Sequence, residues 1–251
     1  MIELKGVYKA FGRQVVLDGV DFEVRTGETV ALLGPSGTGK SVLLKHIVGL
    51  LMPDRGEVLV GGLSVPRLPR RELTELRKRI GYAFQMGALF DSMSVYENIR
   101  LGINDETQYR DKAYCDERVA ECLRLVNLQP EVSNKLPAAL SGGMKKRVGI
   151  ARAIAGKPSY LLYDEPTSGL DPVNADAMDE LIERLQKEMK VTSVVVSHDV
   201  RGSFKVADRI ALLHHGRIRK VGTAEEFVNA KDEVVREFLE RDFQLLETDT
   251  E

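Results

Sequence analysis

Gly34-Pro35-Ser36-Gly37-Thr38-Gly39-Lys40-Ser41 is the stretch of sequence that decides the fold. It matches the pattern G-x-x-x-x-G-K-[ST], which binds phosphate when it joins a strand to a helix. Residues 29–33 are typical of a short buried strand, and residues 42–51 have the spacing of an amphipathic helix. These flanks favour a phosphate loop over the simpler alternative, a glycine-rich turn that binds nothing.

The residue types in this loop suit a polyphosphate bound together with a magnesium ion. Glycines let successive backbone N–H groups point into one concavity, and the following helix adds its positive N-terminal end. We expect the Lys40 ammonium group to reach the β- and γ-phosphates. The Ser41 hydroxyl is the kind of oxygen ligand that Mg²⁺ prefers. The sequence therefore predicts a site for ATP and Mg²⁺.

The composition excludes some classes of partner. The 251 residues include 36 basic and 38 acidic side chains, interspersed along the chain, for a net charge of −2. No basic stripe or polybasic run marks a nucleic-acid groove or a lipid surface, so nucleic acid is not an expected partner. The longest apolar stretch, residues 42–52, is too short to span a bilayer, and residues 1–5 lack a signal-peptide core. We expect a soluble protein that stays where it is made.

Hydrophobic periodicity predicts an α/β fold with a mainly parallel sheet. Residues 2–24 alternate apolar and polar positions around a Gly12-Arg13 turn, which indicates antiparallel strands. Residues 86–157 form a helical insertion, and residues 225–243 have the spacing of one or two amphipathic helices that either pack on the core or bind a partner. Further strands are predicted at 56–60, 80–85, 160–163, 193–196 and 210–213, and helices at 70–79, 95–101, 112–127, 142–155 and 173–189.

Asp164 and Glu165 follow the apolar strand segment 160–163. A buried strand that ends in a carboxylate presents it beside the phosphate loop, at the carboxyl edge of the sheet. We expect Asp164 to hold Mg²⁺ and Glu165 to polarise an attacking water, which is the step that separates hydrolysis from binding. A solvated acidic turn is the alternative for this pair alone, and the phosphate loop in the same chain favours the catalytic interpretation.

Four other groups are candidate nucleotide contacts. Ser141-Gly142-Gly143 opens a basic amphipathic helix, a second anion-binding arrangement that suggests a second nucleotide. His198 ends a strand at the same sheet edge, where an imidazole can contact a γ-phosphate, although a lone histidine more often has a structural role. Phe11 either stacks on a base or belongs to the core. Gln85 can ligate Mg²⁺ through its amide oxygen, and the apolar residues 86–90 after it are either core or a docking surface.

Taken together, these residues resemble the nucleotide-binding subunit of ABC transporters over residues 2–223. The resemblance implies a P-loop NTPase fold with a RecA-like sheet, an N-terminal antiparallel β-subdomain and an inserted helical subdomain. It places an ATPase domain at 1–223, its helical subdomain at about 86–157, and a C-terminal extension with an acidic tail at 224–251. It aligns Phe11 with the base-stacking aromatic, 34–41 with Walker A, Gln85 with the Q-loop, 140–144 with the signature, Asp164 and Glu165 with Walker B, 168–171 with the D-loop, and His198 with the switch histidine.

The resemblance also implies partners. In this family two subunits pack head to tail, so that Walker A of one and the signature of the other enclose each ATP. A membrane permease inserts a short helix beside the Q-loop, which places the ATPase peripherally at the cytoplasmic face of the inner membrane. Met144 stands where the family usually has Gln, which puts that amide contact in doubt. This variant, with residues 84–92, resembles the Mla/Mce-type phospholipid-trafficking and solvent-tolerance branch, whose members work with a substrate-binding protein and in some cases a STAS-domain protein.

Three alternatives remain open from the sequence. A soluble ABC-type ATPase of DNA repair or translation usually carries a long coiled coil or a second cassette, and this sequence has neither. A nucleotide-binding scaffold that does not hydrolyse ATP would have no use for Glu165. Transport of another substrate class also remains, because an ATPase subunit does not contact the cargo.

Overall fold

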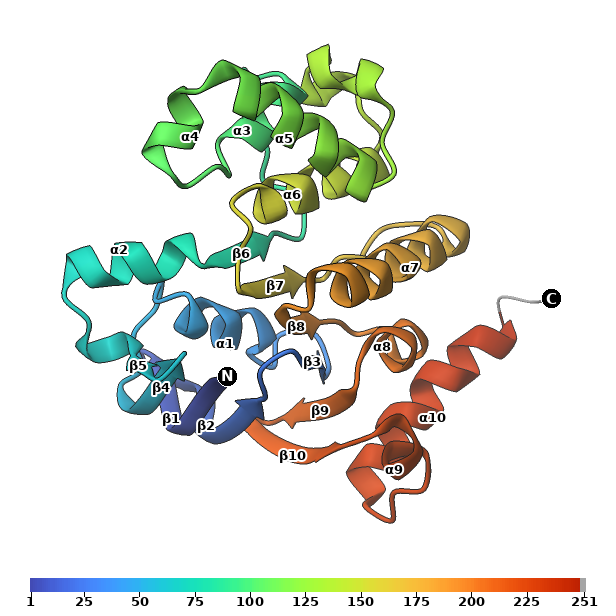
Figure 1. Ribbon diagram of the computed structural model, residues 1–251. Helices are drawn as coiled ribbons and strands as arrows, with labels where there is room; N and C mark the ends of the chain where they lie inside the picture. Colours follow the sequence, from blue (N-terminus) through green and yellow to red (C-terminus); the bar gives the residue numbers. More distant parts are fainter. Residues whose placement is uncertain (249–251) are drawn as a thin grey trace. The chain divides into compact units, whose positions relative to one another are not determined.

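The structure, a computed structural model, describes residues 1–248 and divides into two compact units (Figure 1). The first unit contains both ends of the chain, Met1–Leu68 and Val194–Glu251, and the second is the continuous segment Pro69–Ser193. Residues 249–251, part of the predicted acidic tail, lie outside the described residues. The predicted division into an ATPase domain, a helical subdomain and a C-terminal extension stays a prediction.

An antiparallel sheet forms the N-terminal part of the first unit. β1 (Ile2–Phe11) pairs with β2 (Gln14–Val24) on one side and with β4 (Arg55–Val60) on the other, and β4 pairs with β5 (Leu63–Ser64). Gly12, with a φ of 61°, makes the turn between β1 and β2 in a conformation that favours glycine. The antiparallel strands predicted for residues 2–24 are therefore confirmed.

A second sheet in the first unit carries the strand that leads into the glycine loop. β3 (Thr29–Leu33) is buried along its whole length and pairs in parallel with β9 (Arg209–His214), which pairs antiparallel with β10 (Arg217–Gly222). β8 (Thr192–Val196) lies on the other side of β3. Just after β8, the backbone N–H of Ser197 donates to the carbonyl oxygen of Leu32 at 3.2 Å. The ends of β3 and β8 are thus adjacent.

The C-terminal helices pack on this sheet. Phe227, Val235 and Leu239 are buried in one cluster with Leu33 and Leu212 of β3 and β9. Part of the apolar face predicted for residues 225–243 therefore packs on its own core, whereas Val228 is 59% exposed and the side chain of Phe243 lies outside the described ones. The helices of this unit are α1 (Lys40–Ile47), the 3₁₀ helix η1 (Val65–Arg67), α8 (Val200–Val206), α9 (Ala224–Val228) and α10 (Glu233–Thr248).

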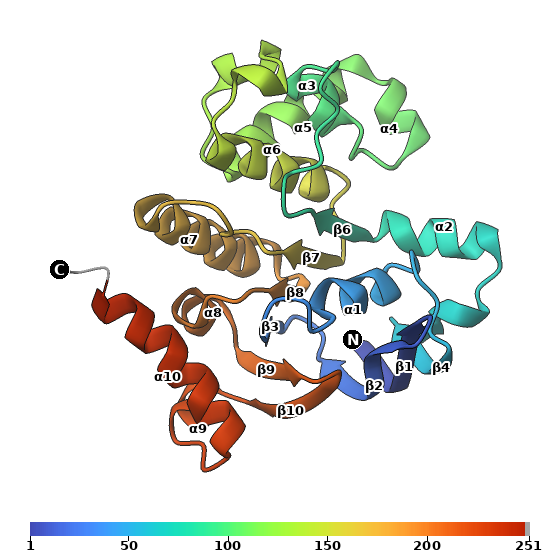
Figure 2. The same ribbon diagram turned by 180° about the vertical axis from the view of Figure 1, so that it is seen from behind.

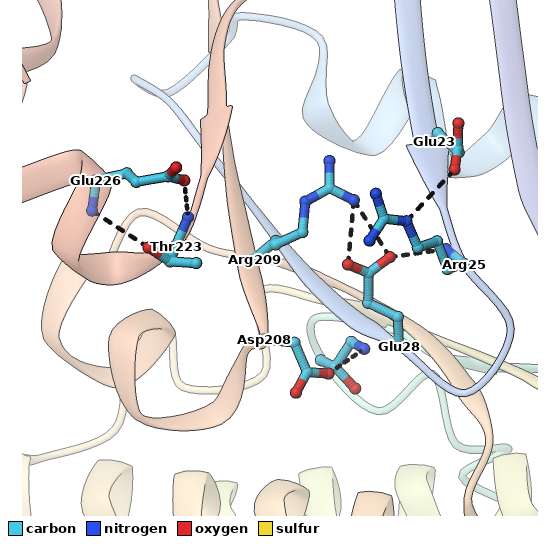
Figure 3. A network of polar contacts seen from close by, with 8 residues as sticks. Glu23, Arg25, Glu28, Asp208, Arg209, Thr223 and Glu226 are labelled. Atoms are coloured by element: carbon cyan, nitrogen blue, oxygen red, sulfur yellow. Dashed lines mark hydrogen bonds and ion pairs between the residues drawn. The ribbon is translucent and has the colours of Figure 1, made fainter.

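Polar contacts fix the beginnings of β3 and β9 (Figure 3). The Arg209 guanidinium group donates to the two carboxylate oxygens of Glu28 at 3.1 and 3.4 Å, and the backbone N–H of Arg25 donates to Glu28 Oε2 at 2.7 Å. Asp208 Oδ2 accepts a hydrogen bond from the backbone N–H of Thr29 at 2.8 Å. These contacts hold the strand that leads into the glycine loop against a strand from near the end of the chain.

The second unit is built on two parallel strands. β6 (Ile80–Ala83) pairs with β7 (Tyr160–Asp164), with Ile80 opposite Tyr160. Helices α3 to α6 lie together in Figures 1 and 2 and form the helical insertion that the sequence predicts. The helices of this unit are α2 (Arg70–Lys78), α3 (Val95–Arg100), α4 (Glu106–Arg110), α5 (Lys112–Leu125), η2 (Pro130–Asn134), η3 (Pro137–Ala139), α6 (Gly142–Ala155) and α7 (Pro172–Met189).

The predicted elements differ from the observed ones at helix ends and in short elements. α1 ends at Ile47 and not at residue 51, because Gly49 (φ 68°) turns left-handed and the N–H groups of Leu50 and Leu51 return to the carbonyl of Lys45. Helix α4 is absent from the predicted elements, and it buries no side chain that would mark it. Within residues 1–248 the structure has no helix with the length and apolar character of a membrane span.

Candidate functional site

The predicted site residues fall into two groups, one in each unit. The first unit holds Phe11, residues 34–41 and His198. The second unit holds Gln85, residues 141–143, Asp164 and Glu165. Each group has its own geometry.

The glycine loop leaves β3 at Gly34, where a side chain cannot fit. A Cβ atom on Gly34 would lie 2.3 Å from the carbonyl oxygen of Leu213 in β9. Lys40 is only 6% exposed, and its ammonium group donates to the carbonyl oxygens of Gly34 at 2.7 Å and Pro35 at 3.2 Å. The Thr38 hydroxyl also donates to Pro35, at 2.8 Å. The loop is therefore curled tightly, with the lysine cation held at its inner side.

The start of α1 suits a phosphate group. Gly39 is the N-cap residue, with a φ of 102°, and it offers no side chain to cap the helix; the first turn contains no acidic residue. A Cβ atom at this position would lie 2.8 Å from Val16 Cγ1, so glycine is required. N–H groups at a helix start that lack a side-chain cap attract anions. With the Ser41 hydroxyl in the same turn, these residues fit the predicted polyphosphate and Mg²⁺.

Phe11 is a surface aromatic and not a core residue. Its side chain is 47% exposed at the end of β1. The Lys9 ammonium group lies 5.6 Å from the ring centroid and pairs with Asp54 Oδ1 at 2.8 Å. Asp54 Oδ2 accepts a hydrogen bond from the backbone N–H of Ala10 at 2.8 Å. The strand end that presents the ring is thus braced, and base stacking stays the prediction for Phe11.

His198 is exposed directly after β8. Because Ser197 bonds to Leu32, two residues before Gly34, His198 and the glycine loop leave the sheet at adjacent points. The backbone after His198 is held as well, since Asp199 caps α8 by accepting a hydrogen bond from the N–H of Gly202 at 3.0 Å. This location agrees with the predicted contact to a γ-phosphate, which remains a prediction.

In the second unit, Asp164 is the buried last residue of β7. The Tyr82 hydroxyl on β6 donates to Asp164 Oδ2 at 2.9 Å. Burial, and then the charge of Asp164, raise the pKa of Tyr82 well above its ordinary value, so the phenol keeps the proton that it donates. A carboxylate oriented by a neutral donor suits the predicted role of Asp164 as a Mg²⁺ ligand.

Glu165 lies in a tight turn after β7. Its φ of 51° is left-handed, a conformation that costs free energy for a residue with a side chain. The carbonyl oxygen of Glu165 accepts hydrogen bonds from the backbone N–H of Ser168 at 3.3 Å and from the Lys146 ammonium group at 3.0 Å. The predicted catalytic carboxylate is therefore attached to a backbone that is held from two sides.

Gln85 lies in a turn after β6 and contacts the segment that follows Glu165. Its amide Nε2 donates to the Ser168 hydroxyl at 3.4 Å. Ser168 begins the segment 168–171, so the structure brings the predicted Q-loop and D-loop residues together. The amide oxygen that a Mg²⁺ ion requires is the other polar atom of the same side chain.

Ser141 is the N-cap of α6. Its hydroxyl oxygen accepts a hydrogen bond from the backbone N–H of Met144 at 3.3 Å, and the first turn contains no acidic residue. Ser141 and Gly142 are exposed, and a Cβ atom on Gly142 would meet no atom within 4 Å. The arrangement is an open helix start that attracts anions, as predicted for residues 141–143.

Two residues in contact with the predicted site are absent from the sequence predictions. Tyr82 has the pattern of an ordinary strand residue, and Lys146 that of a basic helix surface. A signal for Lys146 does exist, because it lies four residues before Ile150 and eight before Ile154 and shares their buried face of α6. A lysine at such a position needs a buried acceptor.

Comparisons with known proteins agree on one family. The family described as "ABC transporter" matches residues 17–168. The "Intermembrane phospholipid transport system ATP-binding protein MlaF" of Haemophilus influenzae is 38% identical over 239 residues, which cover 95% of this chain and 90% of that protein. The "Probable ribonucleotide transport ATP-binding protein mkl" of Mycobacterium leprae is 39% identical over 238 residues, 95% of this chain and 68% of that protein.

Two further similarities bear on cargo and fold. The "Sulfate/thiosulfate import ATP-binding protein CysA" of Caulobacter vibrioides is 39% identical over 234 residues, 92% of this chain and 67% of that protein. The solved dimeric structure of a post-hydrolysis state of the ATP-binding cassette MJ0796, bound to ADP and Pi, has a TM-score of 0.81 at 33% identity and covers 89% of this chain and 98% of that chain. The predicted α/β fold class of a P-loop NTPase is confirmed.

Proposed function

Because the chain belongs to the family of ABC transporter ATP-binding subunits, we propose that it is the ATPase that drives phospholipid trafficking through a membrane permease. The predicted ATPase activity and the predicted use of ATP with Mg²⁺ are confirmed by this membership. The family alone does not specify a cargo, since its members are named for the transport of different substrates.

Phospholipid is the cargo class that two observations support. MlaF, which is named for intermembrane phospholipid transport, matches over 90% of its length. The signature variant with Met144, together with residues 84–92, has the resemblance to the lipid-trafficking branch. CysA, named for sulfate and thiosulfate import, matches with similar identity over 67% of its length, which makes import of another substrate the alternative.

The chain's own residues bind and orient the nucleotide. ATP with Mg²⁺ supplies the phosphoanhydride bond that is hydrolysed. We assign phosphate binding to residues 34–41 and to Lys40 in particular, and base stacking to Phe11. Residues 141–143 bind the phosphates of a second subunit's nucleotide. The Ser41 hydroxyl, the Gln85 amide and the Asp164 carboxylate would supply oxygen ligands for Mg²⁺.

Glu165 is the proposed general base, and His198 contacts the γ-phosphate. The observation that carries the proposal is the turn at Glu165, where Lys146 and Ser168 hold the backbone at a left-handed φ of 51° directly after the buried Asp164. A free-energy cost of this kind is found where function needs a fixed geometry. It supports a motor that hydrolyses ATP over a scaffold that only binds it.

The active unit that we propose is a head-to-tail dimer. The solved cassette MJ0796 is dimeric, and residues 1–248 of this chain include two helix starts that attract anions, one after Gly39 and one after Ser141. Each ATP would then lie between residues 34–41 of one subunit and residues 141–143 of the other. The ATPase domain comprises residues 1–223 with its helical subdomain at about 86–157, and residues 224–251 form the extension.

The permease holds this dimer at the cytoplasmic face of the inner membrane. Met86 and Phe90, which follow Gln85, are 79% and 55% exposed and offer an apolar surface for it. A STAS-domain accessory protein and a substrate-binding protein on the far side of the membrane are the further partners proposed for the lipid branch.

The role of Glu165 is tested by Glu165→Gln. The amide keeps the shape of the side chain but removes the charge that activates water, so turnover should fall by roughly 10²- to 10⁴-fold. ATP binding should remain, measured with a fluorescent nucleotide analogue. Glu131→Gln, on the short helix η2, is the matched control and should behave as wild type. A steady-state rate of Glu165→Gln within about threefold of wild type would remove this assignment.

The cargo is tested on the complex purified from membranes. An integral membrane protein should copurify with the chain, and the ATPase rate of the complex should depend on added phospholipid. A rate that responds to sulfate and not to phospholipid would favour the alternative cargo. If no membrane protein copurifies with the chain, a soluble ATPase would be favoured.

A further inference from the structure

Lys146 is a buried cation whose hydrogen bond reaches the turn that carries Glu165. It is 8% exposed, on the face of α6 that packs against the rest of the second unit. Burial lowers the pKa of Lys146, and the charge of Glu165 acts in the opposite direction. An ammonium group in such surroundings must be hydrogen-bonded. Its acceptor is the backbone oxygen of Glu165, at 3.0 Å.

The helix that carries Lys146 is itself held firmly. A Cβ atom on Gly149 would lie 2.9 Å from the Cα atom of Gly87, and one on Gly81 of β6 would lie 2.4 Å from the carbonyl oxygen of Ala153. These close approaches leave α6 little room to shift against β6 and the loop after it. The backbone of α6 from which the Lys146 side chain extends is therefore fixed in position.

The acceptor turn, in contrast, is strained. Glu165 has a φ of 51° and is followed by Pro166, so its conformation is far from the extended one that a residue before proline prefers. Within the turn, the N–H of Ser168 bonds to the Glu165 carbonyl at 3.3 Å, which is long for such a bond. The shorter bond from Lys146 comes from another element. A change in this backbone would move the attached carboxylate.

We propose that Lys146 is a positioning residue for hydrolysis, whose ammonium group holds the strained turn so that the Glu165 carboxylate keeps the orientation that water activation requires. This inference rests on the proposed role of Glu165. Lys146 itself touches no reacting atom. A buried lysine also costs folding free energy, so its presence in α6 fits a functional use better than a purely structural one.

The test compares Lys146→Met, Lys146→Arg and Lys146→Gln with Lys145→Met in the full-length protein. Methionine fills a similar volume without a donor, so kcat should fall at least about tenfold while the KM for ATP stays within about twofold. The melting temperature of Lys146→Met should not fall, because the substitution removes a buried charge. Arginine, which keeps a charged donor, should restore most of kcat, and glutamine, a neutral donor, part of it. Lys145→Met, the neighbouring lysine, should behave as wild type.

Two readouts separate positioning from structure. In the Glu165→Gln background, Lys146→Met should leave ATP binding unchanged, because Lys146 acts only through Glu165. A kcat of Lys146→Met within about twofold of wild type would overturn the inference. So would a parallel loss of kcat and melting temperature that neither arginine nor glutamine restores, or a failure of all three variants to fold.

Glu165→Gln, measured in the same series, distinguishes a failure of the proposed role of Glu165 from a failure of the inference about Lys146. If it is inactive and Lys146→Met is fully active, the inference about Lys146 fails and the role of Glu165 stands. If Glu165→Gln keeps a rate within about threefold of wild type, the role of Glu165 fails and the inference falls with it.

Discussion

At the scale of single residues, Tyr82 and Asp164 form a hydrogen bond that can be tested by removing one oxygen atom. The Tyr82 hydroxyl donates to Asp164 Oδ2 at 2.9 Å, and burial keeps the phenol protonated. Groups that hydrogen-bond to a metal ligand fix its orientation, and their loss typically lowers metal affinity by about 10- to 100-fold. Tyr82 therefore belongs to the proposed Mg²⁺ site without being a ligand.

Tyr82→Phe should raise the Mg²⁺ concentration needed for half-maximal ATPase activity by about tenfold, with little change in maximal rate at saturating Mg²⁺. Direct titration of Mn²⁺ binding to the ATP-bound protein by electron paramagnetic resonance provides a readout that does not depend on turnover.

The matched control for this prediction is Tyr96→Phe. The Tyr96 hydroxyl also donates to an aspartate, Asp116, at 2.7 Å, but neither residue belongs to the predicted site. Equal Mg²⁺ dependence of Tyr82→Phe and Tyr96→Phe would show that the hydroxyl of Tyr82 has no influence on the metal.

Single residues differ in how far the sequence predicts them. Residues 34–41 are predictable, because the spacing of Gly34, Gly39, Lys40 and Ser41 is itself what the phosphate chemistry needs. Phe11 is different: the same aromatic suits a core or a surface, and only the packing of β1 leaves it 47% exposed. The contact of Lys146 with Glu165 joins residues 19 positions apart and depends on how α6 meets β7.

At the scale of elements, α6 connects several parts of the second unit. It begins at Ser141, reaches Glu165 through Lys146, and holds the loop after Gln85 through Arg152. The Arg152 guanidinium group donates to the carbonyl oxygens of Gly87 and Ala88, both at 2.8 Å. Burial lowers the pKa of Arg152. This loop is therefore anchored at its base, while Phe90 beyond it stays exposed.

Phe90→Asp should leave the isolated subunit folded and able to bind ATP but unable to join the permease. The side chain is 55% exposed, so a charge is tolerated in the free subunit. In a docked complex the same charge would be buried without a partner, at a cost of roughly several kcal/mol. Copurification from detergent-solubilised membranes measures the effect.

Val228→Asp is the control for Phe90→Asp, because Val228 is 59% exposed on α9, in the other unit. It should copurify with the permease at wild-type yield. Normal copurification of Phe90→Asp would remove the docking role of this loop, and a Phe90→Asp subunit that does not fold would assign Phe90 to the core.

Elements with strong local sequence signals have the bounds that the sequence predicts. α6 has its predicted bounds because Ser141 caps its start and Gly156 follows its end. β6 stops at Ala83, two residues before the predicted end, and Gln85 lies in a turn. β10 is absent from the predicted strands because charged residues make up half of it, and only its antiparallel pairing with β9 makes it a strand.

At the scale of the whole molecule, the proposed dimer predicts complementation between two defective subunits. Lys40→Ala removes the cation from the glycine loop, and Gly142→Asp places a negative charge where residues 141–143 should meet phosphate. The fold can accept the second change, because a Cβ atom on Gly142 meets no atom within 4 Å. A mixed dimer then contains one composite site free of both changes and one with both.

Mixing the two variants should restore ATP binding to one site per mixed dimer, measured on isolated mixed dimers as ATP bound at half the wild-type stoichiometry. Each variant alone should bind weakly, because each of its two sites is defective. Absence of recovery on mixing would favour sites built within a single chain.

The arrangement of the whole chain is only partly predictable. Alternating strands and helices around the glycine loop predict the α/β class, because parallel strands need crossover helices. The pairing of β3 with β9 is not local, and no pattern in either strand specifies its partner. The burial of Phe227 and Leu239 also follows only from where the last helices meet the sheet, since the same apolar face suits a partner protein.

The contacts of Glu28 with Arg209 and of Thr29 with Asp208 also set an order of events during protein synthesis. They join residues 181 and 179 positions apart, so the strand before the glycine loop leaves the ribosome long before its neighbour β9. The second unit is continuous, and all of its residues emerge before β9 does. The nascent chain must therefore carry β3 without these contacts through most of translation, and the start of the strand that leads into the glycine loop is braced only after Asp208 and Arg209 have been made.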